Sequence, residues 1–253
     1  LMIKYFDSFF YPYKNFLDDK KLIKIKYLDK DLFKIKNCTY VIMNPNLLIS
    51  KDYSKYIISN KKRIISILPI NIFKTKDLKN FLIRLNKIGV KNLVIHPYLQ
   101  EIKNLRQLNT IKDFIKEKNF NIFVTTAIGS KKLYQIKPLE ILNMVLDLNI
   151  FNKVVASHMG GFKVKELICL MDQYKNLYAD TSFSLPYWKD SSVETDQSFL
   201  IKRFNNRVLY ASDSPYMKKN FALKCHQYFL KKYNFTNKQK NNLMFDNARR
   251  FFK

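Results

Sequence analysis

A regular alternation of short apolar segments with amphipathic ones most constrains the fold of this chain of 253 residues. Eight runs rich in β-branched and aromatic residues recur at intervals of about 23 to 33 residues. They are apolar on both faces, which is typical of parallel strands buried between helices and a filled interior. These predicted strands cover residues 4–10, 38–43, 63–68, 92–96, 120–126, 153–158, 176–182 and 207–213.

The segments between the later predicted strands have the period of a helix, whereas residues 16–36, between the first two strands, are rich in lysine and poorly patterned. In the first of the later segments, Leu78, Phe81, Leu82 and Leu85 fall on one helical face. Strand–helix alternation of this kind indicates an α/β protein with a parallel sheet, and a length of about 250 residues fits a closed (β/α)₈ (TIM) barrel. No linker interrupts the pattern, so residues 1–253 are expected to form a single domain. The predicted helices cover residues 77–85, 111–118, 139–148, 164–174, 198–204, 221–233 and 237–252.

The formal net charge of +26 comes from lysines that are scattered over nearly every amphipathic segment. The chain is also rich in Ile, Asn, Phe and Tyr, a combination that suggests an AT-rich coding bias. The densest basic run, residues 20–26, lacks the arginine-rich or aromatic-interleaved character of a nucleic-acid motif. We therefore expect a solvated lysine surface and no nucleic-acid partner.

Three further features bear on the cellular setting. No apolar stretch reaches the roughly 18 residues that a membrane-spanning helix needs, and the N-terminus has no signal-peptide pattern. Cys38, Cys169 and Cys225 lie far apart and form neither a CxxC pair nor a zinc-finger spacing. We therefore expect a cytoplasmic protein with three reduced structural thiols, and the sequence leaves its oligomeric state open.

Polar side chains occur where the predicted strands end, which is the face of a (β/α)₈ barrel that carries active sites. His158 ends the sixth predicted strand, just before two glycines, and Asp213 ends the eighth. The two could face one cavity and act as acid and base, because burial and a neighbouring charge shift both pKa values towards neutrality. Further polar residues at strand ends are Asn44, His96, Thr125, Thr126, Asp180, Thr181 and Ser182.

Several of these residues also have a purely structural interpretation. His96 precedes Pro97 and can simply orient a loop, and Asp213 lies in a Ser-Asp-Ser-Pro run where it can cap a turn. Asp7, in an apolar strand, fits a buried and hydrogen-bonded structural group. His226 lies within a helical pattern, which indicates a surface residue or a support for the site. We favour a site role for His158 and Asp213.

Five segments occur in the order and spacing of one protein family: VIHPYLQ (94–100), VVASHMGG (154–161), NLYADTS (176–182), RVLYASDSP (207–215) and NARRFF (247–252). They resemble a strand-four segment, the strand-six, strand-seven and strand-eight motifs, and the closing helix of the amidohydrolase-related (amidohydrolase 2) family. The resemblance extends over about residues 85–253. It implies a (β/α)₈ barrel that hydrolyses amides, esters or lactones, or decarboxylates aromatic and related acids.

Most members of the family bind a divalent metal, often zinc or manganese. The usual ligands are a His-x-His pair after strand one, a histidine after strand five, sometimes the strand-six histidine, and the strand-eight aspartate. Here Phe9 and Tyr11 stand where the resemblance places the His-x-His pair, and Thr125 or Thr126 where it places the strand-five histidine. Phenylalanine cannot bind zinc, and neutral tyrosine or threonine binds it poorly. We therefore expect no tightly bound metal and no cofactor.

The leading hypothesis is a metal-independent hydrolase that cleaves a lactone, ester or amide bond in a small, anionic substrate. The resemblance implies that Asp213 is the general base and that His158 positions or polarises the substrate. The alternatives are a non-catalytic barrel that binds a metabolite or a protein partner, a decarboxylase of the same family, and a metal-dependent nuclease suggested only by the charge. The residues expected to bind substrate are Tyr11, Phe9, His96, Thr125, Thr126 and Ser182.

Overall fold

The structure, a computed structural model, describes residues 4–9, 38–41, 64–70, 72, 77–127 and 135–253. Among the residues singled out from the sequence, Asn44 and Tyr11 lie outside these ranges. Residues 10, 42, 43 and 63 of the predicted strands lie outside them too. Cys169 has a free thiol that is exposed, and Cys225 has a free thiol that is buried.

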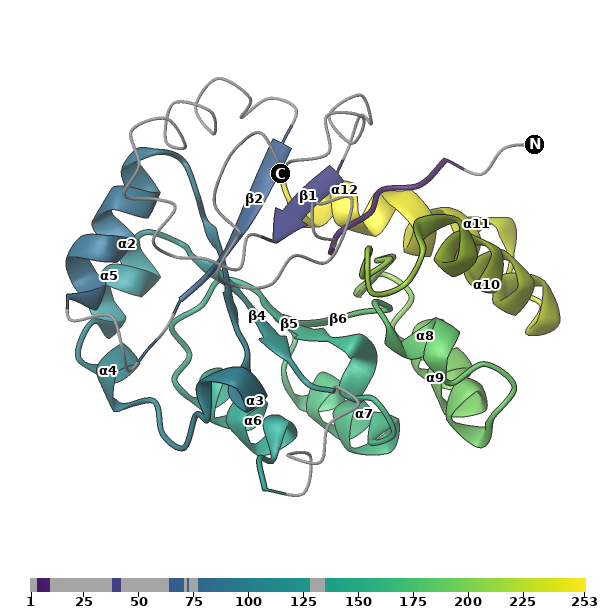
Figure 1. The fold of residues 1–253 in the computed structure, drawn as a ribbon, viewed down its shortest axis with the longest axis horizontal. Helices are drawn as coiled ribbons and strands as arrows, with labels where there is room; N and C mark the ends of the chain where they lie inside the picture. The colour runs from purple at the N-terminus through teal and green to yellow at the C-terminus, as the bar shows by residue number, and fades with distance from the viewer. Residues whose placement is uncertain (1–3, 10–37, 42–63, 71, 73–76, 128–134) are drawn as a thin grey trace.

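A parallel sheet of seven strands occupies the centre of the molecule (Figure 1), and its strands lie side by side in chain order. Every neighbouring pair is parallel, which confirms the α/β class and the successive strand order of a (β/α)₈ barrel. Each strand overlaps one of the last seven predicted strands. They are β1 (Cys38–Val41), β2 (Ile64–Pro69), β3 (Asn92–Ile95), β4 (Asn121–Thr125), β5 (Val154–Ser157), β6 (Leu177–Asp180) and β7 (Val208–Leu209).

The first predicted strand takes the expected place beside β7 but forms no regular ladder in its described part, residues 4–9. The Phe6 N–H donates to the Met244 carbonyl oxygen (2.7 Å), and the Ser8 N–H donates to the Tyr210 carbonyl oxygen (3.0 Å). These acceptors lie on the closing helical segment and on the continuation of β7. The backbone is therefore satisfied by two different elements, and continuous strand pairing does not develop. Figure 1 shows this segment running along the C-terminal helices.

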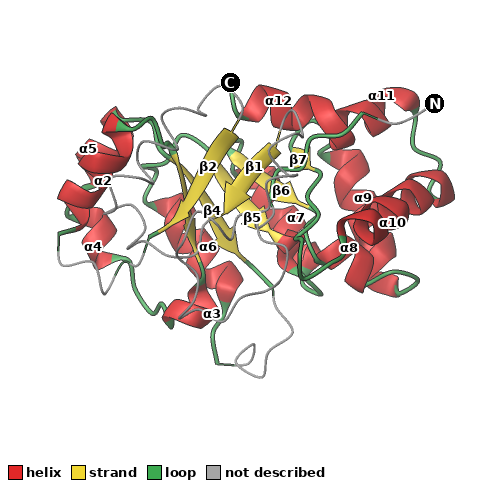
Figure 2. Cartoon of the chain, turned by 45° about the horizontal axis from the view of Figure 1, so that its top comes forward, coloured by secondary structure: helices red, strands yellow, loops and turns green. Residues whose placement is uncertain are grey.

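Helices cover the outside of the sheet, as Figures 1 and 2 show, with α2 and α5 at one side and α10 to α12 at the other. None of the described helices is both long and apolar enough to cross a membrane. The helices are α2 (Leu78–Lys87), α3 (Pro97–Gln100), α4 (Arg106–Asn109), α5 (Lys112–Glu117), α6 (Pro138–Asp147), α7 (Val164–Gln173), α8 (Ser184–Tyr187), α9 (Ser192–Arg203), α10 (Lys219–Lys232), α11 (Asn237–Asn241) and α12 (Asn247–Phe251), with the short turns η5 (His158–Gly160) and η6 (Asn242–Asp246).

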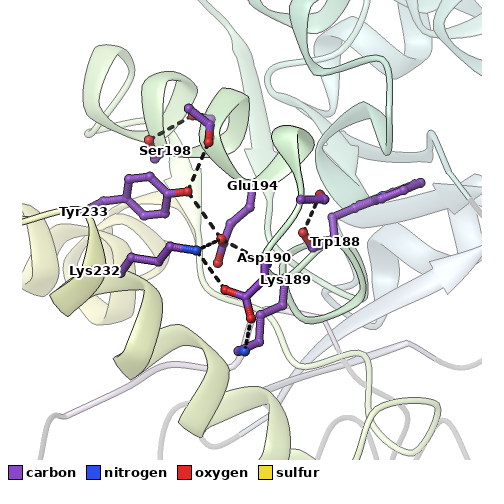
Figure 3. Close-up of polar contacts among 9 residues, drawn as sticks. Trp188, Lys189, Asp190, Glu194, Ser198, Lys232 and Tyr233 are labelled. Atoms are coloured by element: carbon purple, nitrogen blue, oxygen red, sulfur yellow. Dashed lines mark hydrogen bonds and ion pairs between the residues drawn. The ribbon is translucent and has the colours of Figure 1, made fainter.

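Helix α9 begins at Ser192, well before the predicted start at residue 198. The prediction missed these first turns because the side chains buried there are polar. The buried carboxylate of Glu194 accepts hydrogen bonds from the Asp190 N–H (3.1 Å) and the Lys232 ammonium (2.5 Å), as Figure 3 shows. Lys232 also reaches Asp190 (2.8 Å), so this network joins α9 to α10. An apolar pattern cannot identify a helix whose buried face is polar. The predicted last helix, in contrast, is divided by the π-helical turn η6.

The apolar core has two parts, which follow the alternation of side chains along each strand. One face of the strands packs against the helices, and Leu93, Ile122 and Val154 lie there. The other face fills the barrel interior, where Phe123 meets Phe9. The interior cluster consists of Phe6, Phe9, Ile67, Val94, Phe123, Val155, Leu209, Ala211, Phe245, Ala248 and Phe251.

Replacing Phe123 by alanine tests the position of this interior cluster. The ring is fully buried, with its centroid 6.1 Å from that of Phe9 and 5.8 Å from that of Phe251. We expect Phe123→Ala to lower the free energy of unfolding by about 3–5 kcal/mol, because it leaves a cavity in a packed core. Urea denaturation measures the change. The control is Phe199→Ala, at a ring 53% exposed, which should change stability by about 0.5 kcal/mol or less. Equal effects would contradict the interior assignment.

Candidate functional site

The interior positions become polar towards the carboxyl ends of the strands. Thr125 lies opposite Ser157 in the pairing of β4 with β5, and Asp180 lies opposite Leu209 in the pairing of β6 with β7. Paired residues on parallel strands face the same side, so the face that carries Phe123 in the apolar interior carries Thr125 above it. Ser157, Thr125 and Asp180 are buried. A polar layer therefore lies above the apolar one, at the end of the barrel where active sites form.

His158 follows β5 directly, and the end of β6 fixes its imidazole. Nδ1 of His158 lies 2.9 Å from the Ser182 carbonyl oxygen and 2.8 Å from Ser182 Oγ. The Ser182 hydroxyl donates its own proton to the Asp180 carboxylate, so both oxygens near Nδ1 accept. Nδ1 therefore carries the proton, and Nε2 keeps its lone pair. Burial lowers the pKa of His158 while the Asp180 carboxylate opposes this, and the neutral imidazole is favoured.

Asp180 organises this corner of the barrel. Its Oδ1 accepts hydrogen bonds from the His158 N–H (3.1 Å), the Ser182 N–H (3.0 Å) and the Ser182 hydroxyl. Its Oδ2 is buried and has no hydrogen-bond partner within the described ranges. The sequence placed Asp180 at a strand end but gave it no role. Counting the alternation along β6 would have predicted that it faces inward.

The loop after β5 is held in an unusual backbone conformation. His158 and Met159 have φ values of 68° and 50°, and the two glycines that follow also have positive φ. Such conformations cost free energy in residues with a Cβ and are found at functional sites. Thr126 fastens this loop to β4, since its hydroxyl donates to the Ser157 carbonyl oxygen (2.6 Å) and accepts from the Gly160 N–H (2.8 Å). The hydroxyl of Thr126 is therefore engaged by the loop.

Aromatic rings surround the imidazole of His158. The Phe9 ring meets it edge-on with centroids 5.9 Å apart, and the Phe183 ring does so at 6.0 Å. His96, half-buried after β3, has a pKa lowered to about 3 by burial and by the nearby His158. Its backbone N–H donates to the Gln100 side chain (3.0 Å), which fits the loop-orienting interpretation. No local sequence signal marked Phe183 as a neighbour of the site.

Asp213 follows β7 in a left-handed conformation (φ 56°), and its N–H donates to the Phe9 carbonyl oxygen (3.0 Å). The residue is 5% exposed, and its carboxylate forms no hydrogen bond with any residue that the structure describes. Burial raises the pKa of Asp213 well above its ordinary value, and the carboxylates of Asp180 and Asp7 raise it further. Asp180 also acts on His158, so both expected site residues share one charged neighbour.

His226 is a fully buried support, not a surface residue. Its Nε2 lies 2.7 Å from Thr181 Oγ1, and its Nδ1 lies 2.7 Å from the Ala222 carbonyl oxygen. The Tyr210 ring packs edge-on against it at 4.7 Å. Burial lowers the pKa of His226 to about 4. The histidine thus ties α10 to the end of β6 in its neutral form.

The donors among the described residues do not fit the divalent metal that the family resemblance implies. In the described ranges, no three His, Cys, Asp or Glu side chains come together in a group that could hold a metal ion. The Phe9 ring packs against His158 and Phe123 at the position expected of a histidine ligand. A ring without donor atoms thus borders His158, and the backbone carbonyl of the same residue accepts the hydrogen bond from the Asp213 N–H.

Comparison with known proteins supports the barrel, and a family model matches the C-terminal part of the chain. The amidohydrolase family model matches residues 135–253. No curated protein sequence matches the chain. An uncharacterised TIM-barrel protein from Bordetella bronchiseptica superposes with a TM-score of 0.68 at 16% identity, covering 85% of this chain and 77% of its own.

Two further solved structures are similar. A zinc-bound amidohydrolase from Burkholderia multivorans has a TM-score of 0.65 and 11% identity, covering 98% of each chain. A 5-carboxyvanillate decarboxylase from Sphingomonas paucimobilis has a TM-score of 0.61 and 14% identity, covering 88% of this chain and 80% of its own. At these identities the structures confirm the (β/α)₈ barrel and leave the chemistry to be argued from the site.

Replacing Gly161 by alanine tests how tightly the loop after His158 packs. An added Cβ would lie 2.5 Å from the Ala127 Cβ, at a φ of +61°. The control is Gly89→Ala, where φ is +81° and nothing lies within 4 Å of the added Cβ. Both variants should lose about 1 kcal/mol through the positive φ, and Gly161→Ala about 1–3 kcal/mol more through overpacking. Urea denaturation measures both, and equal losses would show that the close approach is unimportant.

The buried His226 predicts a loss of stability in mild acid. The unfolded chain binds a proton near pH 6.5, but the folded chain binds it only near pH 4. The free energy of unfolding should therefore fall as the pH drops through this window, by up to about 1.4 kcal/mol per pH unit. His226→Gln lacks this contribution, so the stability gap between the two proteins should narrow on acidification. Chemical denaturation at pH 5, 6 and 8 measures it, and a constant gap would contradict the assignment.

Proposed function

We propose, from the amidohydrolase match over residues 135–253, that the chain is a hydrolase of that family which works without a catalytic metal. The proposed unit is one domain, residues 1–253. The observation that carries the proposal is the composition of the polar layer. His158 and Asp213 are buried at the carboxyl ends of the strands, and Phe9 lies at a ligand position beside them. The proposed reaction is hydrolysis of a lactone, ester or amide bond in a small substrate.

Asp213 acts as the general base in this proposal. Its carboxylate is buried and makes no hydrogen bond with the described residues. A carboxylate whose pKa is raised is, when ionised, a stronger base than a free aspartate. It takes a proton from a water molecule as the water oxygen bonds to the substrate carbonyl carbon. The same proton then passes to the leaving oxygen or nitrogen as the scissile bond breaks, which restores the carboxylate.

His158 has a positioning role. Its Nδ1 proton is held by Ser182, so Nε2 accepts hydrogen bonds and does not donate them in the neutral form. An accepting Nε2 orients the attacking water or a substrate hydroxyl. Polarisation of the carbonyl would need a donor, so His158 positions the water or substrate and does not polarise the carbonyl. Ser182 contacts the imidazole, and Thr125 is buried in the same polar layer. The charge of +26 favours an anionic substrate by attraction at long range.

A non-catalytic barrel is the second candidate, and the Phe9 ring favours it. The ring borders His158 where a metal-binding enzyme of the family has a ligand. Such a protein would bind a metabolite or protein partner through the same polar layer. A decarboxylase is the third candidate, by analogy with the similar decarboxylase barrel. Turnover separates the non-catalytic barrel from the two enzymes, and the metal content of the purified protein separates the decarboxylase from the metal-independent hydrolase.

Asp213→Asn tests the proposed base. The probes are 4-nitrophenyl acetate and dihydrocoumarin, an ester and a lactone. The variant should lose about 10²–10⁴-fold in kcat, because asparagine cannot accept the proton. The control is Asp113→Asn, at an exposed residue of α5, which should leave kcat unchanged.

Three outcomes would contradict the proposal. Unchanged turnover in Asp213→Asn would exclude Asp213 as the base. Turnover of neither probe by the wild type would favour the non-catalytic barrel. About one zinc or manganese ion per purified chain, with activity lost on chelation, would replace metal independence by the metal chemistry of the family.

A further inference from the structure

The turn that carries Asp213 is held by the N-terminal segment at three points. The Ser212 N–H donates to Asp7 Oδ1 (2.9 Å), and the Ser212 hydroxyl donates to Asp7 Oδ2 (2.6 Å). The Asp213 N–H donates to the Phe9 carbonyl oxygen (3.0 Å). The Ser214 N–H donates to Ser212 Oγ (3.2 Å), which closes the turn on itself. Both oxygens of one buried carboxylate are thus used on the residue next to Asp213.

A buried carboxylate is costly unless a positive charge accompanies it. Asp7 is 1% exposed, and Lys219, at the start of α10, places its ammonium nitrogen 3.9 Å from Asp7 Oδ2. The Lys219 side chain is 16% exposed, and its ammonium also lies over the Tyr5 ring at 5.6 Å. Burial raises the pKa of Asp7, and the Lys219 charge opposes that rise. Lys219 therefore helps Asp7 to keep the charge with which it binds Ser212.

The contacts of Asp7 with Ser212 matter for Asp213 because no hydrogen bond from the described residues holds the Asp213 side chain itself. The carboxylate makes no hydrogen bond there, so its direction depends on the placement of its backbone. That backbone is left-handed, with φ at 56°, a conformation that needs support from its surroundings. A general base must be placed to within about 0.5 Å to work efficiently. An ion could fix such an aspartate, but the described residues hold no group of three donors that could bind one.

We propose that Asp7 and Lys219 form a clamp that positions Asp213 by fixing the turn through Ser212. Asp7 and Lys219 are positioning residues in this scheme, because they are argued to act on the Asp213 backbone through Ser212. The clamp joins three parts of the chain, namely the N-terminal segment, the turn after β7 and the start of α10. The effect of the clamp on catalysis by Asp213 rests on the proposed function. The restraint of the turn at Ser212 and Asp213 does not.

Amide hydrogen exchange by NMR tests, without any substrate, whether Asp7 and Lys219 restrain the turn. Asp7→Asn and Lys219→Met should each raise the exchange rates of the Ser212 and Asp213 amides by about tenfold or more, because a charge-assisted contact is lost. The Ile122 amide in β4 should keep its rate. Lys219→Arg keeps the charge and should keep slow exchange at the turn. Lys218→Met, at the exposed neighbour, is the matched control and should change nothing.

Activity on the 4-nitrophenyl acetate and dihydrocoumarin probes tests the consequence. Lys219→Met should lower kcat by about tenfold with KM unchanged, and Lys219→Arg should restore kcat, because a misplaced base slows chemistry and not binding.

Unchanged exchange at Ser212 and Asp213 would overturn the clamp. Acceleration shared equally by Ile122 would overturn it as well, since it would show global destabilisation. Fast exchange with full kcat would overturn the positioning role. If the wild type hydrolyses neither probe, the proposed function fails by itself, and the exchange rates still decide whether the clamp exists.

Discussion

The contact of residues 4–9 with the end of β7 is the interaction on which the rest of the site depends. This short segment has no ladder of its own, yet it supplies the Phe9 ring beneath His158 and the Asp7 carboxylate beside Ser212. The backbone bond from Asp213 to Phe9 ties the two together. Closing a barrel brings the first and last segments side by side, and here that closure also assembles the candidate site.

The carboxylates at the candidate site differ in the hydrogen-bond donors and the ammonium group that stabilise them. Asp180 receives three donors from His158 and Ser182, and Asp7 receives two donors from Ser212 with Lys219 close by. Asp213 differs from both, since it lacks such donors and burial raises its pKa well above the ordinary range. Carboxylates in one neighbourhood therefore have different roles because their partners differ. Two are structural anchors, and the third is the residue that we propose as the general base.

Much of the fold could be predicted from the sequence because burial leaves a periodic signal. Seven of the predicted strands overlap observed ones, since strands buried on both faces are apolar throughout. The prediction was less accurate where polar groups replace apolar ones. The start of α9 was missed because Glu194 and Gln197 are buried on its first turns. The first segment gave no regular strand because its hydrogen bonds are shared between Tyr210 and Met244.

The sequence by itself determined the alternating architecture, the polar strand ends with His158 and Asp213, and the aromatic residue at position 9. Only the tertiary structure decided which partners these residues have. Ser182 holds the imidazole from 24 residues away, and Asp7 holds Ser212 from 205 residues away. Periodicity reports whether a side chain is buried and towards which face of its own element. It carries no information on the partner across the barrel, because closure of the sheet makes those contacts.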